Sequence, residues 1–187
     1  MKPKKQWIGK TVLLLVLIMT VIGFTLPSVL DNNSQSQVKA EPRVCQNDAE
    51  CYLTCDDKPV MVLCSQNLCQ QNSCKEANYY EFNQNPITFT LAAEIEGKRI
   101  DLTNQSSTKD LFVKLENEKV AVFTSGLNMN QVLEKVKAKL TTECLIINGA
   151  NYCRSESKEL KFMVNGNQLF AYGNYVPQDE DKIEIIY

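Results

Sequence analysis

The sequence predicts an α+β protein built from four successive parts, and three observations lead to this prediction. A long uncharged stretch lies near the N-terminus, six of the eight cysteines lie between residues 45 and 74, and the C-terminal half alternates strand-like and helix-like apolar patterns. We therefore expect a transmembrane anchor over residues 1–30, a flexible linker over 31–43, a disulfide-rich module over 44–76, and a β-rich domain with one amphipathic helix over 86–187.

The anchor is predicted from residues 11–30, which form an uncharged run of twenty residues. As a helix this run would rise about 30 Å, the thickness of a bilayer's hydrocarbon layer. Lysines flank only its N-terminal side, at Lys2, Lys4, Lys5 and Lys10. This asymmetry places the N-terminus in the cytoplasm and the rest outside. The prediction is a single-pass protein of the cell membrane that contacts lipid through residues 11–30.

A cleaved signal peptide is the alternative interpretation of the same segment. The most apolar part covers only residues 12–24, and Pro27 resembles the start of a cleavage region. No A-x-A site follows, so the segment length favours a retained anchor. Beyond it, residues 31–43 contain no aromatic residue and are rich in Ser, Asn and Gln, which is typical of a flexible tether. Asn32 and Asn104 begin N-x-S sequons and are possible glycosylation sites, although such tripeptides often arise by chance in polar loops.

Eight cysteines, an even number, are expected to form disulfides in an exported protein. The disulfide-rich module is too short and too polar to bury an apolar core, so covalent bridges would replace one. Sequence leaves fifteen pairings open for its six cysteines, Cys45, Cys51, Cys55, Cys64, Cys69 and Cys74. The chain has no histidine and no C-x-x-C pair, which argues against zinc and against a redox dithiol. We therefore predict no metal and no cofactor.

The remaining two cysteines flank the stretch CLIINGANYC, residues 144–153. If Asn148 and Gly149 form a type I′ turn, Cys144 faces Cys153 across a hairpin. Counting outward from the turn places the two cysteines at a non-hydrogen-bonded pair, where the strands approach most closely and a disulfide fits. We predict that Cys144 and Cys153 pair and that the upstream six close among themselves.

The β-rich domain is predicted from two strand pairs that precede a helical pattern. Alternating apolar residues start at Ile87 and turn near Gly97, and a second pair turns at residues 116–119. Residues 128–140 then follow helical spacing, with Asn128 and Gln131 as a capping box. The apolar positions of this expected helix are Met129, Val132, Leu133, Val136 and Leu140. Its three lysines, Lys135, Lys137 and Lys139, are interpreted as a solvated face. Two strands, over 160–164 and 182–187, are expected to follow the disulfide hairpin.

The tail KFMVNGNQLFAYGNYVPQDEDKIEIIY resembles the end of ubiquitin-like β-grasp domains of the sulfur-carrier type, in which a strand leads into VNG and an acidic turn precedes the last strand. Residues 87–187 are also similar to uncharacterised archaeal membrane-anchored extracytoplasmic proteins. The resemblance implies a β-grasp-like C-terminal domain. This chain ends at Tyr187 rather than in Gly-Gly and lacks histidine, so neither carrier chemistry nor histidine-based metal binding is implied.

Catalytic patterns are missing from the sequence. Without histidine there is no Ser-His or Cys-His pair, and no phosphate-binding glycine motif occurs. Carboxylates cluster at Asp56 with Asp57 and at residues 179–181, where solvated turns are expected; a weak calcium site at the second cluster is the alternative. Beyond residue 30 the chain carries 16 basic and 22 acidic residues, a net charge of −6, which argues against nucleic-acid binding.

Two functions from different classes remain. The first is a tethered binding or scaffolding module for another protein of the cell envelope, with Val60, Met61 and Val62 either exposed as contacts or buried beneath the bridges. The second is an exported carboxylate-dependent enzyme, or an accessory subunit of an envelope enzyme complex. The absence of a recognisable base favours the module, so no catalytic residue is assigned.

Overall fold

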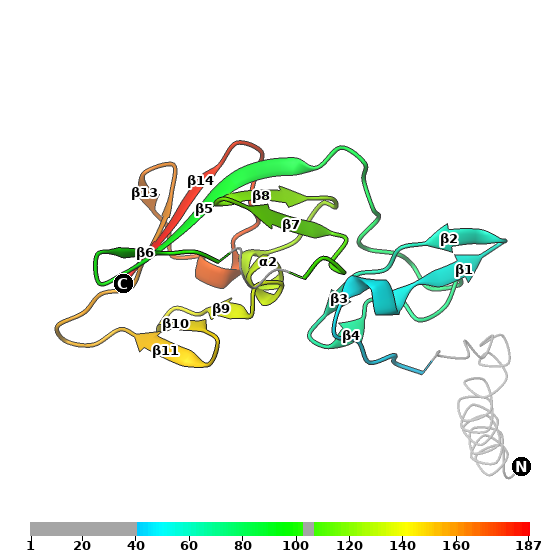
Figure 1. Ribbon diagram of the computed structural model, residues 1–187, viewed down its shortest axis with the longest axis horizontal. Helices are drawn as coiled ribbons and strands as arrows, with labels where there is room; N and C mark the ends of the chain where they lie inside the picture. Colours follow the sequence, from blue (N-terminus) through cyan, green and yellow to red (C-terminus); the bar gives the residue numbers. More distant parts are fainter. Residues whose placement is uncertain (1–40, 103–106) are drawn as a thin grey trace, which may run out of the picture. The chain divides into compact units, whose positions relative to one another are not determined.

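The computed structural model describes residues 41–102 and 107–187, and these belong to one compact unit (Figure 1). The predicted anchor, most of the linker and both sequon residues, Asn32 and Asn104, lie outside the described residues. Within the described ranges, no helix has the length and apolar character needed to cross a membrane. The unit is α+β, with mostly strands and a disulfide-rich region, as the sequence predicts.

The disulfide-rich module consists of a short 3₁₀ helix and two small hairpins. The 3₁₀ helix η2 covers Asp48–Cys51, and the hairpins pair β1 (Leu53–Cys55) with β2 (Lys58–Val60) and β3 (Cys64–Ser65) with β4 (Leu68–Cys69). Its six cysteines close among themselves, first with fourth, second with fifth and third with sixth. The pairs are Cys45–Cys64, Cys51–Cys69 and Cys55–Cys74.

The interior of this module is made mainly of sulfur. Four cysteines are at most 4% exposed, and Val62 is the aliphatic side chain buried with them. Val60 is half-buried against this cluster, while Met61 packs against the core of the following domain. These three residues are therefore mostly covered rather than free to act as contacts.

The main sheet has seven strands and carries the C-terminal domain. Its strands are β5 (Ile87–Ile95), β6 (Lys98–Ile100), β7 (Val113–Glu116), β8 (Lys119–Val122), β12 (Lys161–Val164), β13 (Asn167–Gln168) and β14 (Lys182–Ile186). The order is β13-β12-β14-β5-β8-β7, with β6 paired to β5. The central neighbours β5 and β14 run parallel, so Ile183 lies beside Leu91; the other pairs are antiparallel.

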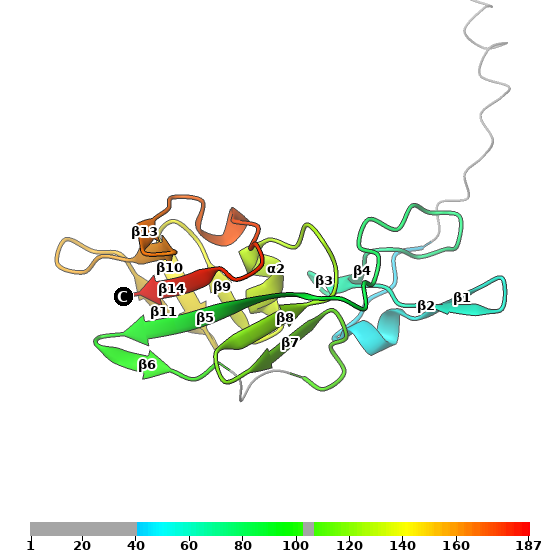
Figure 2. The same cartoon turned by 90° about the horizontal axis from the view of Figure 1, so that it is seen from above.

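The second layer consists of the helix α2 (Met129–Glu134) and a three-stranded sheet of β9 (Ala138–Leu140), β10 (Cys144–Ile147) and β11 (Ala150–Cys153). Figures 1 and 2 show this layer on one face of the main sheet. Alternate residues of β5, including Phe89 and Leu91, point into the core between the layers. Phe112 and Phe162 are fully buried there.

The hairpin of β10 and β11 has the predicted register. Asn148 and Gly149 have φ values of 50° and 81°, the left-handed conformation that a type I′ turn requires. Cys144 pairs with Cys153, and their sulfurs are bonded with the Cα atoms 4.0 Å apart. The predicted bridge is confirmed.

The predicted helix over 128–140 is wrong in length. The capping box of Asn128 and Gln131 is present, but the helix ends at Glu134. Lys137 has φ 54°, and residues 138–140 form β9 instead. The stretch VKAKL alternates apolar and lysine residues, and this period of two places Val136, Ala138 and Leu140 in the core. Pairing with β10 satisfies the backbone of β9, so the sheet prevails over helical spacing.

Candidate functional site

Every cysteine of the described residues is in a disulfide. The sulfurs of Cys45, Cys51 and Cys69 lie within 4.8 Å of one another, a spacing that would suit a metal ion if they were thiolates. Each of them is bridged, Cys45 to Cys64 and Cys51 to Cys69. The group is therefore the buried interior of the module, with no thiolate to offer a metal.

A buried carboxylate fastens the disulfide-rich module to the β-rich domain. Asp48 is fully buried. Its Oδ1 accepts hydrogen bonds from the Cys64 amide at 2.9 Å and from Lys135 Nζ at 2.7 Å. Its Oδ2 accepts from the amides of Leu111 and Phe112 at 2.7 and 3.1 Å. One side chain thus satisfies donors from three separate segments of the chain.

Lys135 is the cation of this Asp48 cluster, and its interpretation as part of a solvated face is wrong. Only 7% of the residue is exposed, and Nζ also donates to the Cys64 carbonyl at 2.7 Å and to Asp110 Oδ1 at 3.3 Å. Lys137 and Lys139 are exposed, as predicted. Lys135 follows α2 directly, so the helix end aims it at the module.

Asp110 is the second carboxylate beside Lys135 and is 4% exposed. Burial raises its pKa, and this effect outweighs the opposing attraction of Lys135. The neighbouring Glu134 extends the same contact, because its carboxylate accepts hydrogen bonds from the Ser65 hydroxyl and the Gln66 amide. A buried carboxyl with a raised pKa is a common mark of an active site. Here the Asp48 and Asp110 carboxylates both accept hydrogen bonds from Lys135 and belong to the contact between the module and the domain.

The sequence predicts that all three acidic residues at 179–181 are solvated, and this prediction is wrong for one of them. Asp179 and Glu180 are exposed, but Asp181 is 5% exposed. Its Oδ2 accepts from the Tyr175 hydroxyl at 2.7 Å and the Gln178 amide at 2.8 Å, and its Oδ1 accepts from Asn165 Nδ2 at 2.8 Å. The Asp181 carboxylate braces the turn before β14, and its oxygens face protein donors.

These contacts shift the pKa values of Asp181 and Tyr175. Burial alone would raise the pKa of Asp181, but the hydrogen bonds from Gln178, Tyr175 and Asn165 together hold it below its usual value. Burial, and then the hydrogen bond to Asp181, raise the pKa of the Tyr175 hydroxyl to about 12. A carboxylate that accepts three donors has little capacity left for calcium. Asp56 and Asp57 are the exposed turn between β1 and β2, as predicted.

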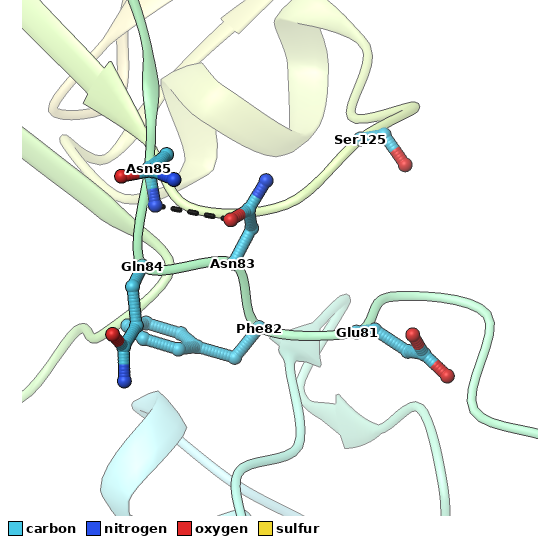
Figure 3. A pocket seen from close by; sticks show the side chains of 6 residues that line it. All are labelled: Glu81, Phe82, Asn83, Gln84, Asn85 and Ser125. Carbon is cyan, nitrogen blue, oxygen red and sulfur yellow. Dashed lines mark hydrogen bonds between the residues drawn. The ribbon is translucent and has the colours of Figure 1, made fainter.

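A polar hollow of about 540 Å³ opens where the segment that leads into β5 passes the loop after β8 (Figure 3). Its lining residues are Glu81, Phe82, Asn83, Gln84, Asn85 and Ser125. The sequence does not predict this hollow, because a polar stretch between two elements is typical of an ordinary surface loop. The dashed line in Figure 3 is the hydrogen bond that the Asn85 backbone amide donates to Asn83 Oδ1, at 3.0 Å.

Aromatic contacts and hydrogen bonds hold the segment that lines the hollow in place. The Phe82 ring stacks on Phe123, with centroids 5.4 Å apart, and meets Phe112 edge-on at 5.6 Å. The Asn83 amide donates to the Phe123 carbonyl at 2.6 Å. Upstream, the Tyr80 hydroxyl accepts from Gln131 Nε2 at 3.0 Å, which ties the segment to the capping box of α2.

Comparisons with protein-family models, curated proteins and solved structures found no match to this chain.

Proposed function

We propose that the protein is a membrane-anchored extracytoplasmic module that binds or scaffolds another protein of the cell envelope. The observation that carries this proposal is the joint at Asp48. It makes the disulfide-rich module and the β-rich domain a single body, and such a body holds a binding surface in a fixed orientation.

The four disulfides support the extracytoplasmic location. Disulfides persist in oxidising compartments and are rare where glutathione keeps thiols reduced. Two of them, Cys45–Cys64 and Cys51–Cys69, take the place of an apolar core, so the module depends on their oxidation. With the lysine-flanked apolar run at residues 11–30, this fits a domain held outside the cell membrane.

We further propose a β-grasp-like arrangement for the C-terminal domain. The resemblance in the VNG stretch and the acidic turn suggests it, and two features of the sheet support it. The first and last strands of the domain, β5 and β14, are parallel neighbours at the sheet's centre, and α2 packs on one face. A domain of this kind presents the long loop between β13 and β14 at its surface.

That loop is the proposed contact with the partner. Phe170 is 75% exposed and Val176 is 39% exposed, and both flank the 3₁₀ helix η4 (Tyr172–Asn174). The loop is braced from within by Tyr172, whose hydroxyl donates to the Leu160 carbonyl, and by Tyr175 on Asp181. An exposed aromatic side chain on a rigid loop costs little entropy when it binds, which suits an interface anchor.

Photo-crosslinking in native membranes tests this function. With a photoreactive phenylalanine at position 170 of the full-length protein, we expect one discrete protein adduct. A Phe170→Ser variant should lose most capture of that same partner in a detergent extract, because its apolar anchor is gone.

Tyr79 provides the matched control, since it is an 80% exposed aromatic residue outside the loop. Tyr79→Ser should leave capture of the partner unchanged, and a photoreactive residue at position 79 should not give the same adduct. If the two serine variants reduced capture equally, or if position 170 gave no adduct, the loop would not be the binding surface.

A further inference from the structure

We propose that the hollow lined by Glu81–Asn85 and Ser125 is a binding site for an uncharged polyhydroxylated ligand, the sugar units of a glycan. This goes beyond the binding of a protein through the Phe170 loop. It rests on free polar groups, a rigid base and the charge of the lining.

The first observation is a set of polar groups that have no protein partner. Within the described residues, no hydrogen bond involves the side chains of Gln84, Asn85 or Ser125, and the Asn83 carboxamide uses only its oxygen. Each free carboxamide offers N–H donors beside a carbonyl acceptor, and the Ser125 hydroxyl both donates and accepts. Neighbouring sugar hydroxyls present the same pairing of donor and acceptor.

The second observation is that the lining is held in place before any ligand arrives. The Phe82 ring is stacked on Phe123, and the Asn83 amide is bonded to the Phe123 carbonyl. An Asn83–Asn85 hydrogen bond fixes the turn between them. These contacts hold the backbone of the lining, so the segment loses less entropy when a ligand binds.

A third observation comes from the loop that supplies Ser125. The hydroxyl of Thr124, the preceding residue, is buried and has no hydrogen-bond partner in the described part of the chain. Buried hydroxyls are usually hydrogen-bonded, so an exception calls for an explanation. Thr124 lies between Phe123, whose carbonyl accepts the hydrogen bond from the Asn83 amide, and Ser125, which lines the hollow.

The charge of the lining selects the ligand class. Glu81 is the only charged residue among the six, so an anionic ligand would meet a carboxylate and no cation. A single carboxylate is too few for calcium, which takes six to eight oxygens. The one aromatic ring is already packed against two others, so the walls are too polar for an apolar ligand. A volume of about 540 Å³ lies within the range of small-molecule sites.

Titration by nuclear magnetic resonance tests the proposal on the full-length protein in lipid nanodiscs, without glycoside detergents. The probes are maltotriose, mannotriose and chitotriose, with sialyllactose and inorganic phosphate as charged comparators. We expect at least one neutral trisaccharide to shift the backbone amides of residues 81–85 and 125 in a saturable way, and neither charged probe to bind more tightly.

A Gln84→Ala/Asn85→Ala double variant should weaken that binding about tenfold, because it removes two hydrogen-bonding side chains. Asn151→Ala is the matched control, since Asn151 is an exposed amide on β11 outside the hollow, and it should leave binding unchanged. Amide spectra of both variants show whether the fold is kept, which we expect because all three side chains are exposed.

Three results would overturn the proposal: no neutral saccharide binds, the shifts map elsewhere, or the double variant binds as well as the parent. Loss of binding in Glu81→Gln together with a requirement for a divalent cation would also overturn it, because the site would then be ionic. A glycopeptide bearing the active saccharide, compared with the free sugar, distinguishes a protein-linked glycan from a free polysaccharide. The Phe170→Ser variant should bind the sugar normally, so this test is independent of the proposed protein partner.

Discussion

The disulfide-rich module and the β-rich domain reach a stable interior by opposite means. In the module, four of the five buried core residues are cysteines. In the domain, the core is aliphatic and aromatic and joins both layers. The contrast teaches that a short polar segment can be ordered by covalent constraint, whereas a longer one buries enough apolar surface to order itself.

The contact between the two regions uses a third means. Leu63 and Met61 pack against the domain core, but the polar part of the contact is the Asp48 cluster. Apolar packing tolerates small shifts, while a carboxylate with four donors requires one arrangement. The buried charge therefore specifies the orientation of the module on the domain.

The largest effect is expected from Asp48→Ala. Removing this carboxylate leaves Lys135 buried with Asp110 as its remaining ion-pair partner among the described residues, and it takes away the Asp48 acceptor of three backbone amides. We expect a loss of about 4 kcal/mol in the free energy of unfolding, measured by urea denaturation. Lys58→Ala, at an exposed strand position of the same module, should change stability by less than about 0.5 kcal/mol. Equal effects of the two variants would show that the Asp48 cluster does not join the two regions.

The next largest effect is expected from removing one disulfide, either in the module or in the hairpin. Replacing Cys45 and Cys64 by alanine should cost about 3 kcal/mol, and replacing Cys144 and Cys153 about 2 to 3 kcal/mol on the chain-entropy model, because the second loop is shorter. The consequences should differ more than the energies. Amide exchange should rise throughout the module in the first variant, but only near β10 and β11 in the second. Uniform exchange in both variants would contradict a module held by its bridges.

A smaller loss is expected from Gly173→Ala in the domain core. A Cβ atom there would lie 2.1 Å from Asn130 Nδ2 and 2.3 Å from the Leu140 carbonyl oxygen. The Asn130 side chain is needed, because its Oδ1 accepts from the Leu140 amide at 2.9 Å. We expect a cost of about 1 to 3 kcal/mol by thermal unfolding. Gly97→Ala is the contrasting variant: its φ is positive and the added Cβ meets no atom within 4 Å, so its cost comes from backbone strain, whereas the cost at Gly173 comes from the clash.

The smallest effect is expected from a change of pH, to which two of the buried carboxylates, Asp181 and Asp110, should respond in opposite directions. The pKa of Asp181 is lowered in the folded protein, so its stabilisation is present above the unfolded pKa and is lost as pH falls through the folded pKa. The pKa of Asp110 is raised, so its protonated form favours folding, and its contribution weakens as pH rises through that pKa.

Urea midpoints measured from about pH 6 down to about pH 2 check this pair. Asp181→Asn should lower stability near neutral pH and flatten the loss on acidification. Asp110→Asn should not lower stability near neutral pH as Asp181→Asn does, because Lys135 keeps Asp48. Matching pH profiles for the two variants would contradict the opposite shifts.

The sequence by itself determined the local features. The register of the Cys144–Cys153 hairpin follows from a two-residue turn and the period of a strand, and the capping box follows from two side chains three residues apart. The six upstream cysteines are predicted to pair among themselves, because they lie close together in the sequence and because the hairpin register already pairs the other two. The sequence predicts six of the seven strands of the main sheet, all but β13, and does not predict their order.

Only the tertiary structure decided what depends on distant partners. Residues 136–140 satisfy both a helical and an alternating pattern, and pairing with β10 selects the strand. Lys135 and Asp181 look like solvated charges in the sequence, since no local signal marks the segments that bury them. The polar hollow depends on the approach of residues 81–85 to Ser125, about forty positions further along the chain. Such contacts arise from packing between elements, because side-chain patterns encode which face is buried and not what covers it.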